Sequence, residues 1–228
     1  MAIDPSDPHQ DALFREVDED LRHEQMERLW KKYGNVAIGI AVMIVMIVGG
    51  REAWTTWQAN RLADEAMRYG TAVAMIDAGV KEPAAQALVT LAEEAGATYR
   101  TLATLRRGDF LADVGDRAGA IAAWRMVAAD QAADQAYRDA AAVLVAMHGL
   151  DDADPRQIET TLMPLTAAGN PYRFTALELS ALAAMRAGDD ARAREVLTRL
   201  ADDPETPPGV RARAAEMLSQ ARSSLSKG

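Results

Sequence analysis

The sequence predicts an all-α protein, in which one N-terminal transmembrane helix is followed by a solenoid of helical hairpins and a C-terminal capping helix. Three observations predict this fold: an apolar run from Ala37 to Val48, apolar residues that recur every three or four positions beyond Arg51, and Gly and Pro residues that interrupt this pattern at intervals. Hydrophobic residues make up 49% of the 228 residues and aromatic residues only 5%. This composition, rich in alanine, favours closely packed helices over a β-sandwich.

The N-terminal tail, residues 1–33, is predicted to form a short cytoplasmic helix. Asp7 followed by Pro8 has the pattern of an N-cap with proline at the first helical position. Glu24 and Arg28 stand four residues apart in the order that stabilises a helix. The tail is interpreted either as a solvated helix or as a docking helix for a cytoplasmic or membrane partner.

Residues 34–53 are predicted to cross a membrane. The 18 residues from Tyr33 to Gly50 carry no charge, and at about 1.5 Å per residue they span roughly 27 Å, close to the thickness of about 30 Å of a hydrocarbon core. A buried core helix would rarely carry aromatic residues at both ends, and a cleaved signal peptide would lack such a long acidic lead. We therefore expect an uncleaved anchor. The flanking aromatic residues are Trp30, Tyr33, Trp54 and Trp57.

Basic residues on the two sides of this segment predict its orientation. Because Lys and Arg accumulate on the cytoplasmic side of a membrane, we expect the N-terminus in the cytoplasm. In a bacterium the protein would then be a single-pass inner-membrane protein, with its C-terminal domain in the periplasm. The basic residues near the segment are Arg22, Arg28, Lys31 and Lys32 before it, and Arg51 and Arg61 after it.

Residues 54–224 are predicted to form one helical-repeat domain, and residues 225–228 a flexible C-terminus. Glycines such as Gly96, Gly115 and Gly188 separate apolar-periodic pieces of about 12 to 20 residues, a length typical of helices in globular domains. These pieces are expected to pair into antiparallel hairpins. The expected hairpins cover residues 59–95, 98–130, 134–168 and 172–203, and the capping helix covers residues 207–224.

Three Tyr-Arg pairs recur along this domain and are each expected to begin a helix. They are spaced by 38 and 35 residues, and such a period with two helices per unit is typical of a helical solenoid. Because first helices line the concave face of such a stack, and Tyr and Arg are frequent binding anchors, the pairs are candidate protein-binding residues. Alternatively, the tyrosines fill gaps between repeats and the arginines are solvated. The pairs are Tyr99-Arg100, Tyr137-Arg138 and Tyr172-Arg173.

A second repeated pattern, which occurs twice in the domain, resembles the turn and second helix of tetratricopeptide repeats. In this pattern a glycine ends the first helix, an aspartate starts the second, an alanine permits close helix contact and a bulky residue follows four positions later. Gly108 also occupies the small position that the resemblance places in the first helix. The resemblance implies a tetratricopeptide-repeat-like (TPR-like) solenoid. The two copies are Gly115-Asp116 with Ala120 and Trp124, and Gly188-Asp189 with Ala193 and Leu197.

The sequence contains none of the common motifs of catalysis or cofactor binding. It has no cysteine, only three histidines (His9, His23 and His148), no glycine-rich phosphate loop and no nucleophile elbow. His148 precedes three aspartates that could be imagined as metal ligands, but a helix end followed by a polar turn is the favoured interpretation. We therefore expect no enzyme, no cofactor or metal, and no small-molecule substrate. The net charge of −9 argues against a nucleic-acid partner.

The layout as a whole resembles the bacterial ancillary Sec translocon subunit family. The resemblance rests on the tail from Phe14 to Arg22, the sequence from Leu29 to Gly34, the single anchor, the divergent repeat domain, and the stretch from Met163 to Leu179. It implies association with the Sec translocon and with periplasmic chaperones that handle exported proteins.

Three function classes follow from this sequence. The favoured one is a membrane-anchored protein-interaction adaptor, associated with the Sec translocon and with exported proteins. The alternative is a TPR-like scaffold or assembly factor for another envelope complex, respiratory, cell-wall or outer-membrane. An enzyme or solute receptor is the third and least supported class.

Overall fold

The computed structural model describes the backbone of residues 8–225 and the side chains of residues 30–36 and 38–220. Over this range every regular element is helical, as the sequence predicts: nine α-helices and one short 3-10 helix. The chain divides after Arg61 into two units, Met1–Arg61 and Leu62–Gly228.

The predicted anchor lies within α1 (Pro8–Asp77). Among the described residues this is the one helix long and apolar enough to cross a membrane. Its most apolar 18-residue window has a mean hydropathy of 2.0, and 6% of that window is buried. Large apolar side chains such as Val45 and Met46 are 69% and 67% exposed. The helix therefore presents an apolar surface that no described part of the protein covers.

Both predicted limits of the anchor, at residues 34 and 53, fall inside α1, and Gly49 and Gly50 are helical as well. The bounds of the tail and of the anchor therefore stay predictions. Of the features expected in the tail, the Asp7 cap and the side chains of Glu24 and Arg28 lie outside the described residues.

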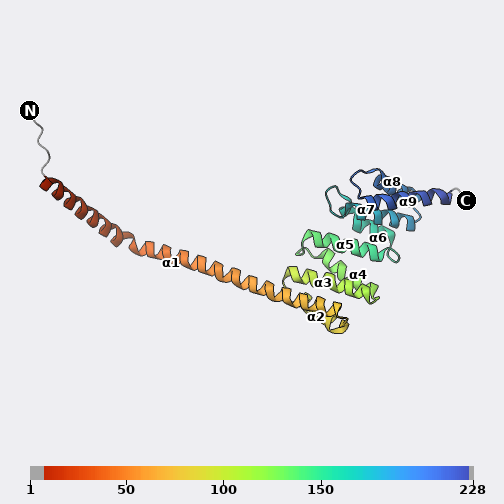
Figure 1. The fold of residues 1–228 in the computed structure, drawn as a ribbon, viewed down its shortest axis with the longest axis horizontal. Helices are drawn as coiled ribbons and strands as arrows, with labels where there is room; N and C mark the ends of the chain where they lie inside the picture. The colour runs from red at the N-terminus through yellow and green to blue at the C-terminus, as the bar shows by residue number, and fades with distance from the viewer. Residues whose placement is uncertain (1–7, 226–228) are drawn as a thin grey trace, which may run out of the picture. The chain divides into compact units, whose positions relative to one another are not determined.

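The second unit is a succession of helical hairpins that follow one another in a stack (Figure 1). The predicted stack of hairpins with a capping helix is confirmed. The helix ends lie within a few residues of those expected, except that the expected start of the first hairpin at residue 59 falls inside α1. The last turns of α1 pair with α2 (Lys81–Glu94), α3 (Ala97–Asp113) with α4 (Arg117–Ala129), α5 (Gln135–Gly149) with α6 (Pro155–Leu162), and α7 (Arg173–Arg186) with α8 (Asp190–Asp202). The 3-10 helix η1 (Met163–Thr166) extends α6, and α9 (Pro208–Leu225) ends the stack.

Each of these helices packs against the next one in the chain, and closely spaced small residues make this possible. Alanines with no exposed surface recur from one helix to the next, so neighbouring backbones approach one another closely. Larger apolar residues then fill the remaining space, forming four core clusters along the stack. The fully buried alanines are Ala72, Ala84, Ala103, Ala120, Ala141, Ala176, Ala181 and Ala214.

In three hairpins the first helix ends in the same way, at a glycine with positive φ. Gly79, Gly115 and Gly188 follow α1, α3 and α7 with φ of 76°, 88° and 74°, a conformation that glycine adopts without steric cost. In each case the glycine N–H and the following N–H donate to carbonyl groups in the last turn of the helix, as in a Schellman motif. The sequence-predicted role of Gly115 and Gly188 as helix ends is confirmed.

The aspartates after two of these glycines begin the next helix, as predicted. Asp116 accepts a hydrogen bond from the backbone N–H of Gly119 at 2.9 Å, and Asp189 accepts one from that of Arg192 at 3.0 Å. The first hairpin has Val80 at this place and no side-chain cap.

The third hairpin departs from this pattern. Asp154 caps α6 through the backbone N–H of Arg156, and Pro155 occupies the first helical position. Helix α6 has only eight residues, and η1, which contains Pro164, continues it. Proline lacks the N–H that an α-helix would need there, so the chain tightens into the 3-10 helix.

In the second hairpin, Trp124 on α4 packs directly against Gly108 on α3. Trp124 on α4 is 1% exposed, and its ring centroid lies 4.6 Å from that of His148 at the end of α5. A Cβ atom at Gly108 would lie 2.3 Å from the indole Nε1 of Trp124. Glycine is therefore required at this position for α3 and α4 to pack as they do.

We predict that Gly108→Ala lowers the free energy of unfolding by about 1 to 3 kcal/mol, because the added methyl group overpacks the site. The measurement is urea unfolding of the full-length protein in detergent, followed by circular dichroism. Gly70→Ala is the matched control: nothing lies within 4 Å of a Cβ there, so its higher helix propensity should leave stability unchanged or raised. Equal stability of the Gly108→Ala variant and the wild type would contradict this packing.

Candidate protein-interaction surface

The three Tyr-Arg pairs lie at the start of the first helices of successive hairpins. Tyr99 and Arg100 are in the first turn of α3, and Tyr137 and Arg138 in that of α5. Tyr172 is the N-cap of α7, which begins at Arg173. Each pair therefore stands at the start of a helix, as predicted, and the third pair lies three positions earlier relative to its helix than the other two. Whether they bind a partner stays a prediction.

The arginines of the first and third pairs close their own hairpins. Arg173 forms ion pairs of 2.9 Å with Asp203, the C-cap of α8, and of 3.1 Å with Glu205, and its side chain is 13% exposed. Arg100 lies 3.8 Å from Asp130, the C-cap of α4. Arg100 and Arg173 thus each join the start of a hairpin to its end. An ion pair between residues so far apart in the chain cannot be predicted from helical spacing.

Arg138 has a different set of contacts. It donates to the backbone carbonyl of Ala133 and to the side chain of Gln135, both within its own turn. The second pair therefore lacks the cross-hairpin carboxylate of the other two.

The tyrosines differ in how far they reach the surface. Tyr99 packs partly buried against the first core cluster, with its ring 6.1 Å from that of Tyr69. Tyr172 packs partly buried against the core between α5, α6 and α7. Tyr137 is 37% exposed. Of the three, Tyr137 is the tyrosine best placed to touch another molecule.

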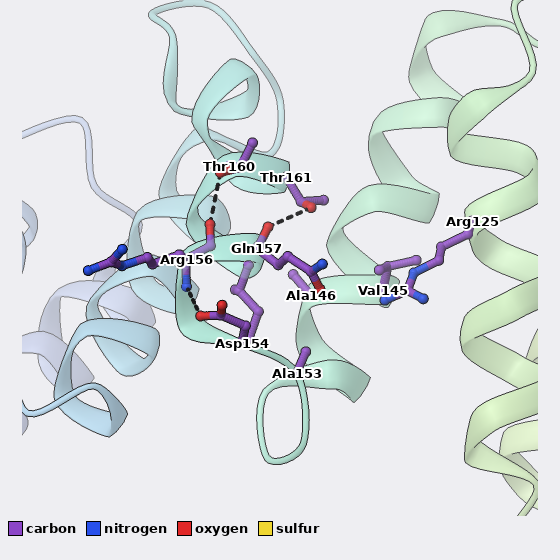
Figure 2. Close-up of a pocket in the computed structure, with 10 residues that line it drawn as sticks. Arg125, Val145, Ala146, Ala153, Asp154, Arg156, Gln157, Thr160 and Thr161 are labelled. Atoms are coloured by element: carbon purple, nitrogen blue, oxygen red, sulfur yellow. Dashed lines mark hydrogen bonds between the residues drawn. The ribbon is translucent and has the colours of Figure 1, made fainter.

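A hollow of about 430 Å³ opens between the second helices α4 and α6, with α5 beneath them. Its floor is apolar and buried, made by Val145, Ala146 and Ile158. Figure 2 shows Arg125 reaching from α4 toward Val145, whereas Arg156 on α6 extends away from Arg125.

A second hollow, of about 320 Å³, opens between α6 and α8, with α7 beneath. It shares Arg156 and Thr160 with the first hollow, so the two hollows are neighbours on either side of α6. Arg199 on α8 lines its far side, and Met163 at its edge is 67% exposed. Sequence reasoning placed the candidate surface on the first helices and did not find these arginines on the second helices.

The signal for these arginines was weak in the sequence. Arg125 has no carboxylate three or four residues away on either side, which marks it as unpaired within its helix. Arg199, in contrast, has Glu195 four residues before it and Asp203 four residues after it. Spacing alone predicts that Arg199 is paired. In the structure Glu195 pairs instead with Arg192, three residues before it on the same helix, and Asp203 pairs with Arg173 at the start of the same hairpin.

The polar turn after His148 is built as the sequence predicts. His148 lies in the last turn of α5, and Arg117 donates to its backbone carbonyl. Arg117 also forms ion pairs of 2.8 Å with Asp151 and 3.2 Å with Asp152. Among the described residues no group of three or more His, Asp or Glu side chains could hold a metal ion.

These features define the class of the protein: a solenoid of helical hairpins, two of which turn at a Gly-Asp pair, preceded in the chain by an apolar helix. The chain belongs to the tetratricopeptide repeat-like domain family, whose family model matches residues 27–146. Searches of curated proteins and of solved structures found no match. Domains of this family are typically non-catalytic scaffolds for protein partners.

One carboxyl group in the repeat domain, that of Asp109 on α3, has a raised pKa. Burial raises the pKa of Asp109 on α3 above its ordinary value of 3.8, while the nearby Arg106 opposes the rise. Because the folded state then holds this proton more tightly than the unfolded chain, stability is lost as the pH rises from about 3.8 through the raised pKa.

Asp109→Asn is therefore predicted to be more stable than the wild type at pH 7, because the amide cannot ionise. The difference should shrink as the pH falls toward 3.8. Urea unfolding over a pH series measures it. Asp113→Asn, at the exposed end of the same helix, controls for the loss of one negative charge. A stability difference for Asp109→Asn that grows on acidification would refute the assignment.

Proposed function

We propose that the protein is a membrane-anchored protein-interaction adaptor. The observation that supports this most is the combination of one uncovered apolar helix with a TPR-like domain in a single chain. An apolar surface of this length is stable in a bilayer and costly in water. The TPR-like domain supplies the interaction surface, and the anchor keeps that surface beside the membrane.

The proposed topology is single-pass in the bacterial inner membrane, with the N-terminus in the cytoplasm and the TPR-like domain in the periplasm. The excess of Lys and Arg before the apolar segment supports this orientation. The aromatic side chains at both ends are exposed: Trp30 by 66% and Trp54 by 63%. Exposed indoles at these positions suit the two membrane interfaces.

The proposed partners are the Sec translocon and the periplasmic chaperones and exported proteins that it serves. Resemblance of the whole layout to the ancillary Sec subunit family supports this assignment. Anchoring raises the effective concentration of the domain for a partner in the same membrane, so modest contacts suffice for binding. We include the three Tyr-Arg pairs in the proposed contact surface, with Tyr137 as the most exposed tyrosine.

The topology predicts the labelling of introduced cysteines, since the chain has none of its own. Ser219→Cys on α9 should react with a membrane-impermeant maleimide in intact bacterial spheroplasts. Ser6→Cys in the tail should react only after the membrane is broken. The reverse pattern would contradict the orientation, and full-length protein in the soluble fraction would contradict the anchor.

A photo-crosslinking residue at Tyr137 should capture a subunit of the Sec channel in native membranes, as read by mass spectrometry. The same residue at the fully buried Leu88 is the control, because it should capture nothing outside the chain. Capture of another envelope complex would select the alternative scaffold function. No protein captured from Tyr137, Tyr99 or Tyr172 would count against an adaptor.

A further inference from the structure

We propose that the two neighbouring hollows between α4, α6 and α8 form one docking groove for an extended acidic segment of a partner protein. Its carboxylates would pair with Arg125, Arg156 and Arg199. This inference rests on the proposed adaptor function and deepens it by naming the chemistry of the partner.

The first support is that three arginines lining the groove have no partner within the protein. Among the described residues, the side chains of Arg125, Arg156 and Arg199 have no hydrogen-bond or ion-pair partner, and all three are exposed.

The carboxylates that line the same hollows are already engaged. Asp154 caps α6. Glu159 and Glu195 both pair with Arg192, at 3.6 Å and 3.0 Å. The groove therefore offers free guanidinium groups and no competing free carboxylate.

These unpaired arginines contrast with the charge of the whole protein, which is −9. Elsewhere in the stack, arginines such as Arg117 and Arg213 hold carboxylates at 2.8 Å and 2.5 Å. Guanidinium groups match carboxylates in geometry and can bind them through two parallel hydrogen bonds. An acidic ligand would therefore find partners at the groove that the protein does not provide for itself.

The shape of the groove indicates a polypeptide segment with apolar residues between its acids. Buried Val145 and Ile158 form the floor of one hollow, and Leu177 and Val196 lie in the other. Met163 stands exposed at the edge, and methionine adapts readily to varied apolar partners. An extended chain can place carboxylates at the arginines and apolar side chains over the floors.

A membrane surface or a nucleic acid fits the groove less well than a peptide. Both carry dense, evenly spread negative charge, which the acidic domain would repel, and Glu159 and Glu195 stand among the arginines. A peptide with spaced carboxylates can avoid these two side chains.

The test uses the full-length protein in a non-ionic detergent and a fluorescein-labelled peptide of glutamate, leucine and serine in equal parts. Fluorescence anisotropy should show binding that weakens as salt is raised. The glutamine-for-glutamate peptide should bind at least about tenfold more weakly, as expected for the loss of charge-assisted hydrogen bonds. Dihexanoyl phosphatidylglycerol, kept below its micelle concentration, should not displace the acidic peptide.

The Arg125→Gln/Arg156→Gln double variant should bind the acidic peptide at least about fivefold more weakly than the wild type. Lys81→Gln/Arg194→Gln removes the same charge at two residues that line neither hollow, and it should bind like the wild type. Both variants change side chains without internal partners, so their circular dichroism and unfolding midpoints should match the wild type.

Three results would overturn the inference: equal binding of the acidic and glutamine peptides, equal losses in the two double variants, or displacement by the short-chain lipid at the concentration of the peptide. The adaptor function is tested separately by crosslinking from Tyr137. A partner captured there in equal amounts by wild type and Arg125→Gln/Arg156→Gln, with no acidic peptide bound, would end the groove assignment and leave the adaptor function in place.

Discussion

Close approach of neighbouring helices at fully buried alanines is the interaction on which the rest of this protein depends. Ala103, Ala120 and Ala141 lie on three successive helices, each with no exposed surface, and Gly108 brings α3 within contact of Trp124. Small residues let the backbones come together, so the large side chains beside them are fully enclosed. Because each helix packs mainly on its neighbours in sequence, the domain is a one-dimensional stack.

The turns make this stack regular. Gly79, Gly115 and Gly188 end three first helices with the same hydrogen-bond pattern, and Asp116 and Asp189 start two of the second helices. A left-handed glycine followed by a capping aspartate reverses the chain within very few residues. The third hairpin replaces this turn by a longer one, fastened by Arg117 to Asp151 and Asp152. This departure brings the short helix α6 to the place where the two hollows meet.

Arginine has two roles in this domain. At the hairpin ends, Arg100 and Arg173 reach the C-cap aspartates of their own units, and the partly buried pair at Arg173 has more structural weight than an exposed ion pair. On the second helices, Arg125, Arg156 and Arg199 line hollows with no internal partner. The first role holds the stack together. The second leaves positive charge available to another molecule on an otherwise acidic protein.

The sequence by itself determined the all-α class, the apolar helix, the succession of hairpins beyond α1 and the Gly-Asp turns. Each of these depends on residues close together in the chain: an apolar run, a helical period, or a glycine beside a cap. The position of Gly108 against Trp124 was also within its reach, through a repeat pattern of fixed spacing. The candidate surface was not. Arg199 has two carboxylates at helical spacing, yet Glu195 pairs with Arg192 of the same helix and Asp203 with Arg173, 30 residues before it. The hollows are lined by residues of α4, α6 and α8 together with the first helices α5 and α7. Tertiary structure decided these features because a carboxylate can pair with any arginine that the fold brings near it, and a hollow forms between helices that are far apart in the chain. Sequence spacing records neither.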